Sequence, residues 1–387
     1  MKKKVVILTS VHRACDTRIF HQQARTLAEA GYAVTVVGRH PRAETVDGVS
    51  IHPIPHIRNR LSRMIVTPLR TGLVALRSGS RICHLHDPEL LPIGLALALL
   101  GRRVVYDVHE DYPQQVLSKY YLHPLARRAA SMIVAAVERI AGSILAAVIT
   151  ATGQIAARFP AHKTRVVRNY PRMTAETCGC NLPTDDTSGR FRLVHLAGTL
   201  SHVRGVTSLV DTMGLLDDSF ELVLAGKWET PAYFHALRHM PGFARIRHVH
   251  HVPHPEVWQL YRRCHVGVIC SLPLPRHLTA LPVKLFEFMA TGLPVVVSNF
   301  PLLRSIVDTH GCGLCVDPTD PKAIADAVRR LAQDRRLART MGRNGMEAVR
   351  QYYNWNSEAA ALLDLYSRLS ESRCVRTSRY PVLSVTT

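Results

Sequence analysis

Features that identify several common classes of protein are missing from this sequence. No stretch is long and uncharged enough for a membrane span: "LLPIGLALALL" has eleven residues, and "SMIVAAVERIAGSILAAVITAT" carries Glu138 and Arg139 in its middle. The nine cysteines include no CxxC pair, and Cys178 and Cys180 are too isolated to indicate a zinc site. Neither GxGxxG nor GxxxxGK[ST] follows an expected strand, which argues against a dinucleotide dehydrogenase or a P-loop enzyme.

Acidic residues are scarce relative to basic ones. The chain has 49 Lys and Arg against 29 Asp and Glu, a formal charge of +20, which implies an acidic partner such as nucleic acid, an anionic membrane or a phosphorylated ligand. Aromatic residues make up only 6%, and no RNP, helix-turn-helix or zinc-finger pattern supports nucleic-acid binding. The start "MKKKVVILTS" has too short an apolar run for a signal peptide, and the cysteines fit a reducing cytoplasm.

Strands and helices alternate twice along the chain. Residues 1–170 contain expected buried strands such as "KVVILTS", "YAVTVVG" and "RVVYDVHE", an order that predicts a doubly wound parallel sheet. Residues 171–190 are rich in Pro, Gly, Thr and Asp and predict a linker. The alternation restarts in residues 191–355, and residues 356–387 form a last helix and a tail that could pack back on the first domain. We therefore predict two Rossmann-like α/β domains that face each other across a cleft and bind ligands at the strand ends.

The stretch "PVKLFEFMATGLPVVVSNFP" predicts a short helix ended by Gly292 and Pro294, followed by a buried strand. Lys284 would lie in the first helical turn, where the helix dipole disfavours a cation. One explanation is an anion bound at the helix start together with the lysine. The other is a simple ion pair with Glu287, three residues on.

Glycines and basic residues follow two further strands in the second half. "LAGTLSHVRGV" places Gly198 at a strand end and Arg204 at a helix start, and "LAGKWE" places Lys227 after the next strand. A glycine lets phosphate approach the backbone, and a basic side chain can bind it. Each position taken alone also fits a turn glycine or a surface cation.

Two strand ends in the first half carry residues suited to a substrate site. "YDVHEDYPQQ" places His109 and Glu110 just past a strand, where a histidine could donate to a sugar hydroxyl or transfer a proton. A histidine that serves the local turn is the alternative. "SVHRACDTRIF" places His12, Arg13, Asp16 and Arg18 at another strand-to-helix turn, where Asp16 could equally cap the helix.

Histidine-rich stretches raise the question of a metal site. "RHVHHVPH" holds His248, His250, His251 and His254, but a strand would send His250 and His251 to opposite faces. "HLHDPE" and "YDVHED" lack a recognised ligand spacing. We expect no metal and no organic cofactor.

Five stretches, in this order, resemble the retaining nucleotide-sugar glycosyltransferases of family 4, and especially bacterial members that build lipid-linked or capsular polysaccharides. They are "DTRIFHQQARTLAEAGYAVTVV", "HLHDPELLPIG", "VVYDVHEDYPQQ", "GTLSHVRGV" and "LPVKLFEFMATGLPVVVS". The resemblance spans nearly the whole chain. It implies two Rossmann-like domains in the GT-B arrangement and metal-independent transfer with retention of anomeric configuration.

The resemblance also implies roles for individual residues. Glu287 matches the glutamate that binds the donor ribose, whereas Thr279 stands where many relatives have a glutamate that contacts the sugar. Thr199 and Arg204 match an Arg/Lys pair that clamps the diphosphate, so one clamp residue is missing and Lys284 is expected to share its role. His109, with Glu110, would contact the transferred sugar. His12, Arg13, Asp16 and Arg18 would lie on the acceptor side.

The excess of basic residues is concentrated in the first half. Residues 1–170 hold 24 Lys and Arg against 10 Asp and Glu, and "HIRNRLSRMIVTPLRTGLVALRSGSR" has six arginines and no acid. We predict that the amino-terminal half, with its charge densest in this segment, docks without crossing on an anionic membrane at the inner face of the cell, where the acceptor would be a glycan or a lipid-linked sugar. Arg58, Arg60 and Arg63 would provide charge and Leu61, Met64, Ile65 and Leu69 a shallow apolar contact, with Pro68 preventing one unbroken helix. A nucleotide-sugar 2-epimerase of the same architecture and a basic nucleic-acid-binding protein remain the alternatives.

Overall fold

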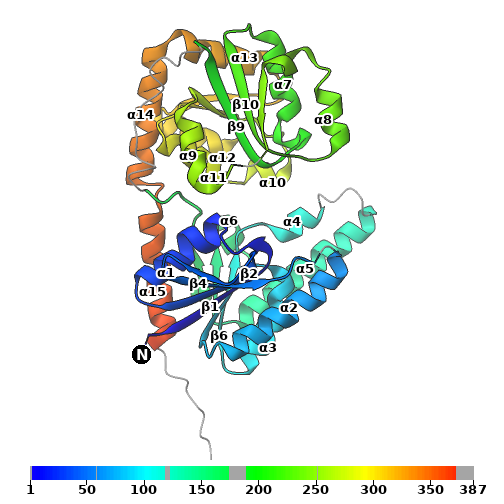
Figure 1. Cartoon of the computed structure of the whole chain (residues 1–387), viewed down its shortest axis with the longest axis vertical. Helices are drawn as coiled ribbons and strands as arrows, with labels where there is room; N and C mark the ends of the chain where they lie inside the picture. Colours follow the sequence, from blue (N-terminus) through cyan, green and yellow to red (C-terminus); the bar gives the residue numbers. More distant parts are fainter. Residues whose placement is uncertain (1, 58, 118–122, 174–188, 251, 372–387) are drawn as a thin grey trace, which may run out of the picture.

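The chain forms two α/β domains, one above the other, with helices running along one side from the upper domain to the lower (Figure 1). The computed structural model describes residues 2–57, 59–117, 123–173, 189–250 and 252–371. Most of the expected linker, and the expected tail from residue 372 onward, lie outside the described residues.

The amino-terminal domain is built on an eight-stranded sheet of order β3-β4-β2-β1-β5-β6-β7-β8. All neighbouring strands are parallel except β3 and β4, which form an antiparallel hairpin at one edge. The strands are β1 (Lys4–Arg13), β2 (Ala33–Arg39), β3 (Glu44–Val46), β4 (Val49–Ile54), β5 (Ile82–Leu85), β6 (Arg103–Val108), β7 (Ala147–Thr150) and β8 (Thr164–Val166).

Helices cover both faces of this sheet because its central strand is apolar on both sides. Val5 and Ile7 of β1 join the core beneath α1 and α15, and Val6 and Leu8 join the core beneath α2, α3 and α5. The helices are η1 (Thr17–Ala24, a π-helix), α1 (Arg25–Glu29), α2 (Arg60–Arg77), η2 (Pro88–Leu90), α3 (Leu91–Leu99), α4 (Tyr112–Leu117), α5 (Pro124–Ile144), α6 (Gly153–Ala156), η3 (Ala161–Lys163) and α15 (Trp355–Glu371).

Helix α2 runs through Pro68, so the expectation that this proline prevents one unbroken helix is wrong. A proline removes one backbone donor from the helical ladder. Pro68 is on the buried side, where α2 packs against β1 and α3, and such tertiary packing stabilises a helix beyond its intrinsic propensity. Thr71 donates its hydroxyl to the Pro68 carbonyl at 2.9 Å.

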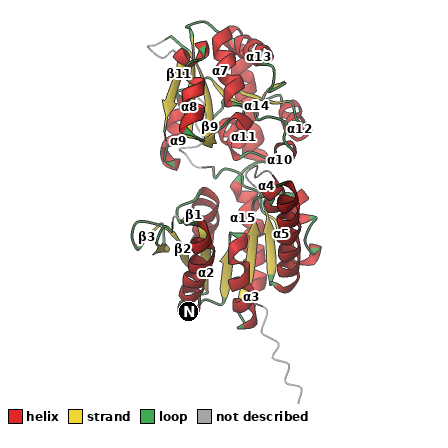
Figure 2. Ribbon diagram, turned by 90° about the vertical axis from the view of Figure 1, so that its right-hand side faces the viewer, coloured by secondary structure: helices red, strands yellow, loops and turns green. Residues whose placement is uncertain are grey.

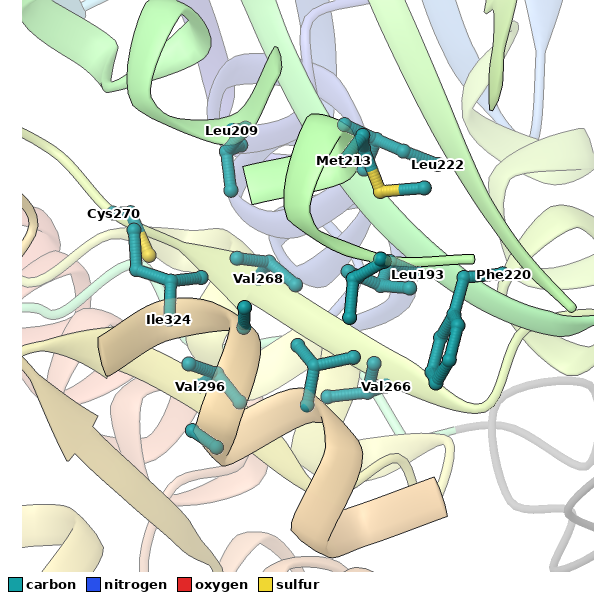
Figure 3. Packing of buried hydrophobic residues seen from close by; sticks show 14 of the residues in the cluster. Leu193, Leu209, Met213, Phe220, Leu222, Val266, Val268, Cys270, Val296 and Ile324 are labelled. Carbon is teal, nitrogen blue, oxygen red and sulfur yellow. The ribbon is translucent and has the colours of Figure 1, made fainter. Parts of the chain in front are cut away.

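The carboxyl-terminal domain has a six-stranded parallel sheet of order β11-β10-β9-β12-β13-β14. Its strands are β9 (Phe191–Leu200), β10 (Phe220–Trp228), β11 (Ile246–Val249), β12 (Val266–Ile269), β13 (Val295–Ser298) and β14 (Gly313–Val316). Its helices are η4 (His202–Arg204), α7 (Val206–Leu215), α8 (Pro231–Leu237), η5 (Pro241–Arg245), α9 (His254–Arg262), α10 (Pro275–Leu278), α11 (Val283–Ala290), α12 (Pro301–His310), α13 (Pro321–Gln333) and α14 (Arg335–Gln351). Figure 3 shows one face of its core, where Leu193, Val266 and Val296 meet Met213 and Ile324.

The last helix returns to the amino-terminal domain. The Trp355 indole donates to the hydroxyl of Thr26 at 2.7 Å, and Leu362 and Tyr366 complete the core beside β1. The Tyr366 hydroxyl meets the His84 imidazole at 2.7 Å. The predicted fold class, two Rossmann-like parallel-sheet domains, is confirmed.

Candidate active site

A cavity of about 460 Å³ separates the two domains. His109 and Glu110 line it from the end of β6, and Arg204, Arg276 and Thr279 line it from the carboxyl-terminal domain. Both groups lie just past the carboxyl ends of parallel strands or in the loops that follow them, as predicted for an open α/β sheet. The structure thus brings three of the predicted site residues, His109, Glu110 and Arg204, to one cavity.

A buried carboxylate lies behind His109. Both carboxylate oxygens of Asp107 accept from Arg18 Nε at 3.1 Å, and the Gln23 side-chain amide donates to one of them at 2.5 Å. His109 Nδ1 faces the same carboxylate at 3.7 Å. Although burial alone would raise it, the pKa of Asp107 is held well below its usual range, chiefly by the charge of Arg18.

Arg18, which was expected on the acceptor side, is held by Asp107 in the interior of the domain. Its side chain is buried, and it also donates to the Val167 carbonyl at 2.9 Å. Asp16 caps η1, accepting from the backbone N–H groups of Arg18 and Ile19. The capping interpretation of Asp16 is the one that the contacts support.

A second buried carboxylate holds His12. Asp87 accepts from the Thr9 hydroxyl and the Ser10 N–H, each at 2.7 Å, and its other oxygen lies 3.0 Å from His12 Nδ1. Burial opposes the charge on His12, but the Asp87 carboxylate raises its pKa to about 9. His12 is thus an imidazolium at neutral pH, and its Nε2 lies 3.4 Å from His109 Nε2.

Arginines gather beside His12. Arg39 pairs in register with Arg13 and donates to the Val11 carbonyl at 3.2 Å, and its pKa is lowered by partial burial and then by the charges of Arg13 and Arg63. Arg13 is exposed, whereas Arg63 is partly neutralised by Glu89 at 3.4 Å. The predicted acceptor side therefore carries a surplus of positive charge.

In the carboxyl-terminal domain, Gly198, Thr199 and Lys227 lie at the ends of two neighbouring strands. Thr199 pairs in register with Lys227, and all three residues are exposed. They are not among the residues that line the cavity. Nothing lies within 4 Å of a Cβ placed on Gly198, so local packing does not require glycine there.

Arg204 and Arg276 bring two positive charges to the cavity wall. The pKa of Arg204 is lowered because partial desolvation and the charge of Arg276 both disfavour its charged form, while Glu110 opposes this across the cavity. Arg276 donates to His277 at 3.3 Å, and His277 also meets the Leu272 carbonyl. Arg276 was not predicted from the sequence, because α10 is one short turn without a recognisable phosphate-binding pattern.

Lys284 and Glu287 lie together on α11, as predicted, with Nζ 2.8 Å from the carboxylate. The Tyr261 hydroxyl donates to the same oxygen at 2.8 Å. Glu287 is only 2% exposed, so the pair is not the solvated one considered from sequence. The lysine at the helix start therefore has a buried partner, and Lys284 is not among the cavity-lining residues, whereas Thr279 is.

The stretches "HLHDPE" and "YDVHED" meet inside the amino-terminal domain. Among the described residues, His84, His86 and Asp107 have potential ligand atoms within 4.8 Å of one another. Arg18 already occupies Asp107 and Tyr366 meets His84, so a cation there would lie against the Arg18 guanidinium. The residues therefore fit a buried polar network better than a metal site.

The other histidine-rich stretch has local partners. His248 meets the Gly226 carbonyl at 2.9 Å and accepts from the Trp228 indole at 3.3 Å. His251 and the side chain of His254 lie outside the described residues.

Within the described part of the chain, no helix is both long and apolar enough to cross a bilayer.

Two family models of known proteins match this chain, one in each half. Residues 17–169 match the family model "Glycosyltransferase Family 4", and residues 187–348 match "Glycosyl transferases group 1". A D-inositol 3-phosphate glycosyltransferase of Xylanimonas cellulosilytica is 30% identical over 191 residues, which is 48% of this chain and 44% of that protein. The match thus spans less than half of the relative's length.

Solved structures share the whole architecture. The sucrose-phosphate synthase of Thermosynechococcus elongatus has a TM-score of 0.73 at 21% identity, covering 95% of this chain and 99% of that one. Anabaena HepE in complex with UDP-glucose has a TM-score of 0.68 at 14% identity, covering 94% and 99%. At these identities the likeness establishes the fold, which is the GT-B arrangement.

Proposed function

We propose that this chain, which belongs to the group 1 and family 4-like glycosyltransferases, transfers a sugar from a nucleotide-diphosphate sugar to a glycan or lipid-linked acceptor. The observation that carries this proposal is the inter-domain cavity, in which His109 from one domain faces Arg204 and Arg276 from the other. The donor would lie against the carboxyl-terminal domain and the acceptor against the amino-terminal domain.

The two arginines suit the leaving group. Two guanidinium groups near each other in a partly desolvated cavity repel, and an anion bound between them removes that cost. A diphosphate offers several oxygens for bidentate hydrogen bonds, and its negative charge grows as the glycosidic bond breaks. Arg276 could thus take the place of the clamp residue missing at Thr199, a role that the sequence analysis gave to Lys284. Glu287, with Lys284, would hold the donor ribose.

His109 would contact the transferred sugar. Its Nε2 is close to the His12 imidazolium, and its Nδ1 faces Asp107, so the ring is held between a cation and a buried carboxylate. In this proposal the reaction proceeds with retention, the attacking hydroxyl approaching from the face that the diphosphate leaves. Positioning and charge stabilisation then supply the rate enhancement without a bound metal or cofactor.

The acceptor side suits a phosphate-bearing molecule. Arg13, Arg39 and Arg63 gather beside His12, and their joint positive charge would attract the phosphate of a lipid-linked sugar. We therefore place the reaction in polysaccharide biosynthesis, at the inner face of the cell membrane. Only the nucleotide-sugar, the acceptor and an anionic membrane surface are proposed as partners, and no nucleic acid.

A panel of sugar nucleotides in a thermal-shift assay tests the donor site, because a ligand that binds only the folded state raises the melting temperature. The stabilising donor is then incubated with and without lipid-linked acceptors, and the anomeric configuration of the product is determined by NMR. Conversion of the sugar nucleotide without any acceptor would instead identify a 2-epimerase. Chelator should leave transfer unchanged.

A further inference from the structure

The outer surfaces of α2, α3 and α5 are unusually apolar for a domain surface. In the described residues, nearly all large apolar side chains that are exposed lie on these helices or at the end of α3, and only Leu215, Leu278 and Tyr352 lie elsewhere. Single exposed apolar residues are ordinary, but a concentration on neighbouring elements marks an interaction surface.

On α2 the exposed apolar residues follow the helical repeat. Ile65, Leu69, Leu73 and Leu76 are 63%, 55%, 51% and 38% exposed, and steps of four, four and three residues align them on one side. The side facing the sheet already has its own buried residues, including Ala75. The outward stripe is therefore not needed for the core.

Helix α5 repeats this pattern. Ile133, Val137, Ile140 and Ile144 are 63%, 39%, 57% and 53% exposed and align in the same way. Helix α3 packs against both α2 and α5, and Leu99 at its end is 86% exposed. Figure 2 shows α2 and α5 on the side of the domain that faces the viewer, with α3 between them.

All exposed charges on these helices have one sign. Arg70 and Arg77 lie on α2, and Arg128 and Arg139 on α5. The only carboxylate in the three helices, Glu138, is buried, where it accepts from the Tyr106 hydroxyl at 2.8 Å and pairs with Arg158. We call this surface, formed by the exposed residues of α2, α3 and α5, the apolar-basic face.

We propose that the apolar-basic face docks on an anionic lipid bilayer, with its apolar stripes entering the interface and its arginines meeting lipid phosphates. A uniformly positive set of charges around apolar side chains complements a continuous layer of anionic headgroups. The sequence predicts docking by the amino-terminal half, with the basic charge densest in residues 56–81. The structure adds α5, whereas Arg58 and the side chain of Arg60 lie outside the described residues.

The face also leads to the acceptor side of the cavity. Arg63, near the start of α2, lies close enough to Arg39 to lower its pKa, and Arg39 donates to the Val11 carbonyl next to His12. A lipid-linked acceptor in the docked bilayer would thus meet basic side chains on its path to the cavity. This step rests on the proposed function, whereas bilayer docking itself requires neither donor nor acceptor.

Flotation of the full chain with phosphatidylcholine vesicles, with or without phosphatidylglycerol, tests the inference. A variant carrying Leu69→Gln, Leu73→Gln, Ile133→Gln and Ile140→Gln should bind anionic vesicles about 100-fold more weakly, because four partly inserted apolar side chains are lost. The control Leu215→Gln with Tyr352→Gln changes exposed apolar residues of the other domain and should bind as wild type. Arg70→Gln with Arg139→Gln should reduce the preference for anionic over neutral vesicles.

Unchanged vesicle binding by the fourfold variant, with its circular dichroism and melting temperature intact, would overturn the inference. A second result would also overturn it: the wild-type chain does not bind vesicles but sediments as a dimer, and the fourfold variant sediments as a monomer. The face would then join two copies of the chain. Donor-induced thermal shift in the same samples separates this result from the proposed transfer. If the fourfold variant loses vesicle binding but its melting temperature still rises with the donor, docking is supported. If the donor raises the melting temperature of no sample, only the proposed function is affected.

Discussion

His12 and His109 face each other with their Nε2 atoms 3.4 Å apart, and each turns its Nδ1 toward a different buried aspartate. Asp87 lies 3.0 Å from His12, and Asp107 lies 3.7 Å from His109. The raised pKa of His12 favours its protonated ring, whose Nε2–H can donate to His109. His109 therefore reaches the cavity with its orientation set by groups outside the cavity.

Replacing His109 by alanine should lower turnover more than donor affinity, because the side chain would act on the reacting sugar and not on the nucleotide. Steady-state kinetics and calorimetric donor binding measure the two effects. Equal loss of both, together with a lower melting temperature, would assign His109 a purely structural role.

Glu287→Ala, Arg204→Ala and Lys284→Ala should each weaken donor binding or turnover in a chain that still folds. A lost charge-assisted hydrogen bond costs about 1.5–3 kcal/mol. Lys284→Ala should also lower the melting temperature, because it removes the ammonium group that lies 2.8 Å from the buried Glu287 carboxylate. Wild-type kinetics in all three variants would remove the donor-site assignment.

Arg276→Gln should weaken binding of a nucleoside diphosphate about 10- to 100-fold and leave binding of the free nucleoside unchanged, because the side chain would hold phosphate oxygens. Calorimetry with both ligands measures the difference, and Arg276→Lys should lose less. Arg304→Gln, on the exposed side of α12, is the matched control. A uniform loss for nucleoside and diphosphate would contradict the clamp role.

The His12–Asp87 pair should make stability depend on pH. The folded-state pKa of His12, about 9, exceeds the ordinary value of 6.5, so the pair contributes fully below about pH 6.5 and its contribution is lost as pH rises through 9. We expect a contribution of about 1–3 kcal/mol, reduced because the side chain is partly exposed. Urea unfolding of wild type and His12→Gln across this range measures it, with exposed His162→Gln as the control. Parallel pH profiles for wild type and His12→Gln would contradict the assignment.

Two glycines of the second domain should respond differently to alanine. Gly205 has φ 79°, and a Cβ there would lie 1.7 Å from the Cys270 carbonyl oxygen. Backbone strain alone costs about 1–3 kcal/mol, and the clash adds to it. Gly198→Ala meets nothing within 4 Å and should leave the free energy of unfolding within about 0.5 kcal/mol of wild type. Denaturant unfolding compares them, and an equally stable Gly205→Ala would show that η4 can shift away from β12.

The sequence predicted the fold and the strand-end residues because both depend on local patterns. Alternating apolar strands and helices predict the sheets, and their carboxyl ends place His109 and Arg204 at one cavity. The pairing of His12 with Asp87 depends on two loops that are far apart in the chain, so no local spacing predicts it.

The sequence predicted an apolar contact by Ile65 and Leu69 of α2, but not its continuation through Leu73 and Leu76 or the stripe on α5, for another reason. A sequence shows that these helices are apolar, but not which apolar residues the sheet covers. Leu73 and Ala75 of α2 look alike in a pattern, yet the first is 51% exposed and the second is fully buried. Only the packing of α2 on the sheet distinguishes them.

Because α15 carries Trp355, Leu362 and Tyr366 into the core beside β1, the carboxyl-terminal domain is an insert within the amino-terminal one. Ribosomal synthesis proceeds from the amino terminus, and domains generally fold as they emerge. Here β1 is synthesised long before α15, so the part of the sheet face that α15 covers stays exposed until the carboxyl-terminal domain has been made. The amino-terminal domain, whose synthesis begins before that of the carboxyl-terminal domain, therefore completes its core after it.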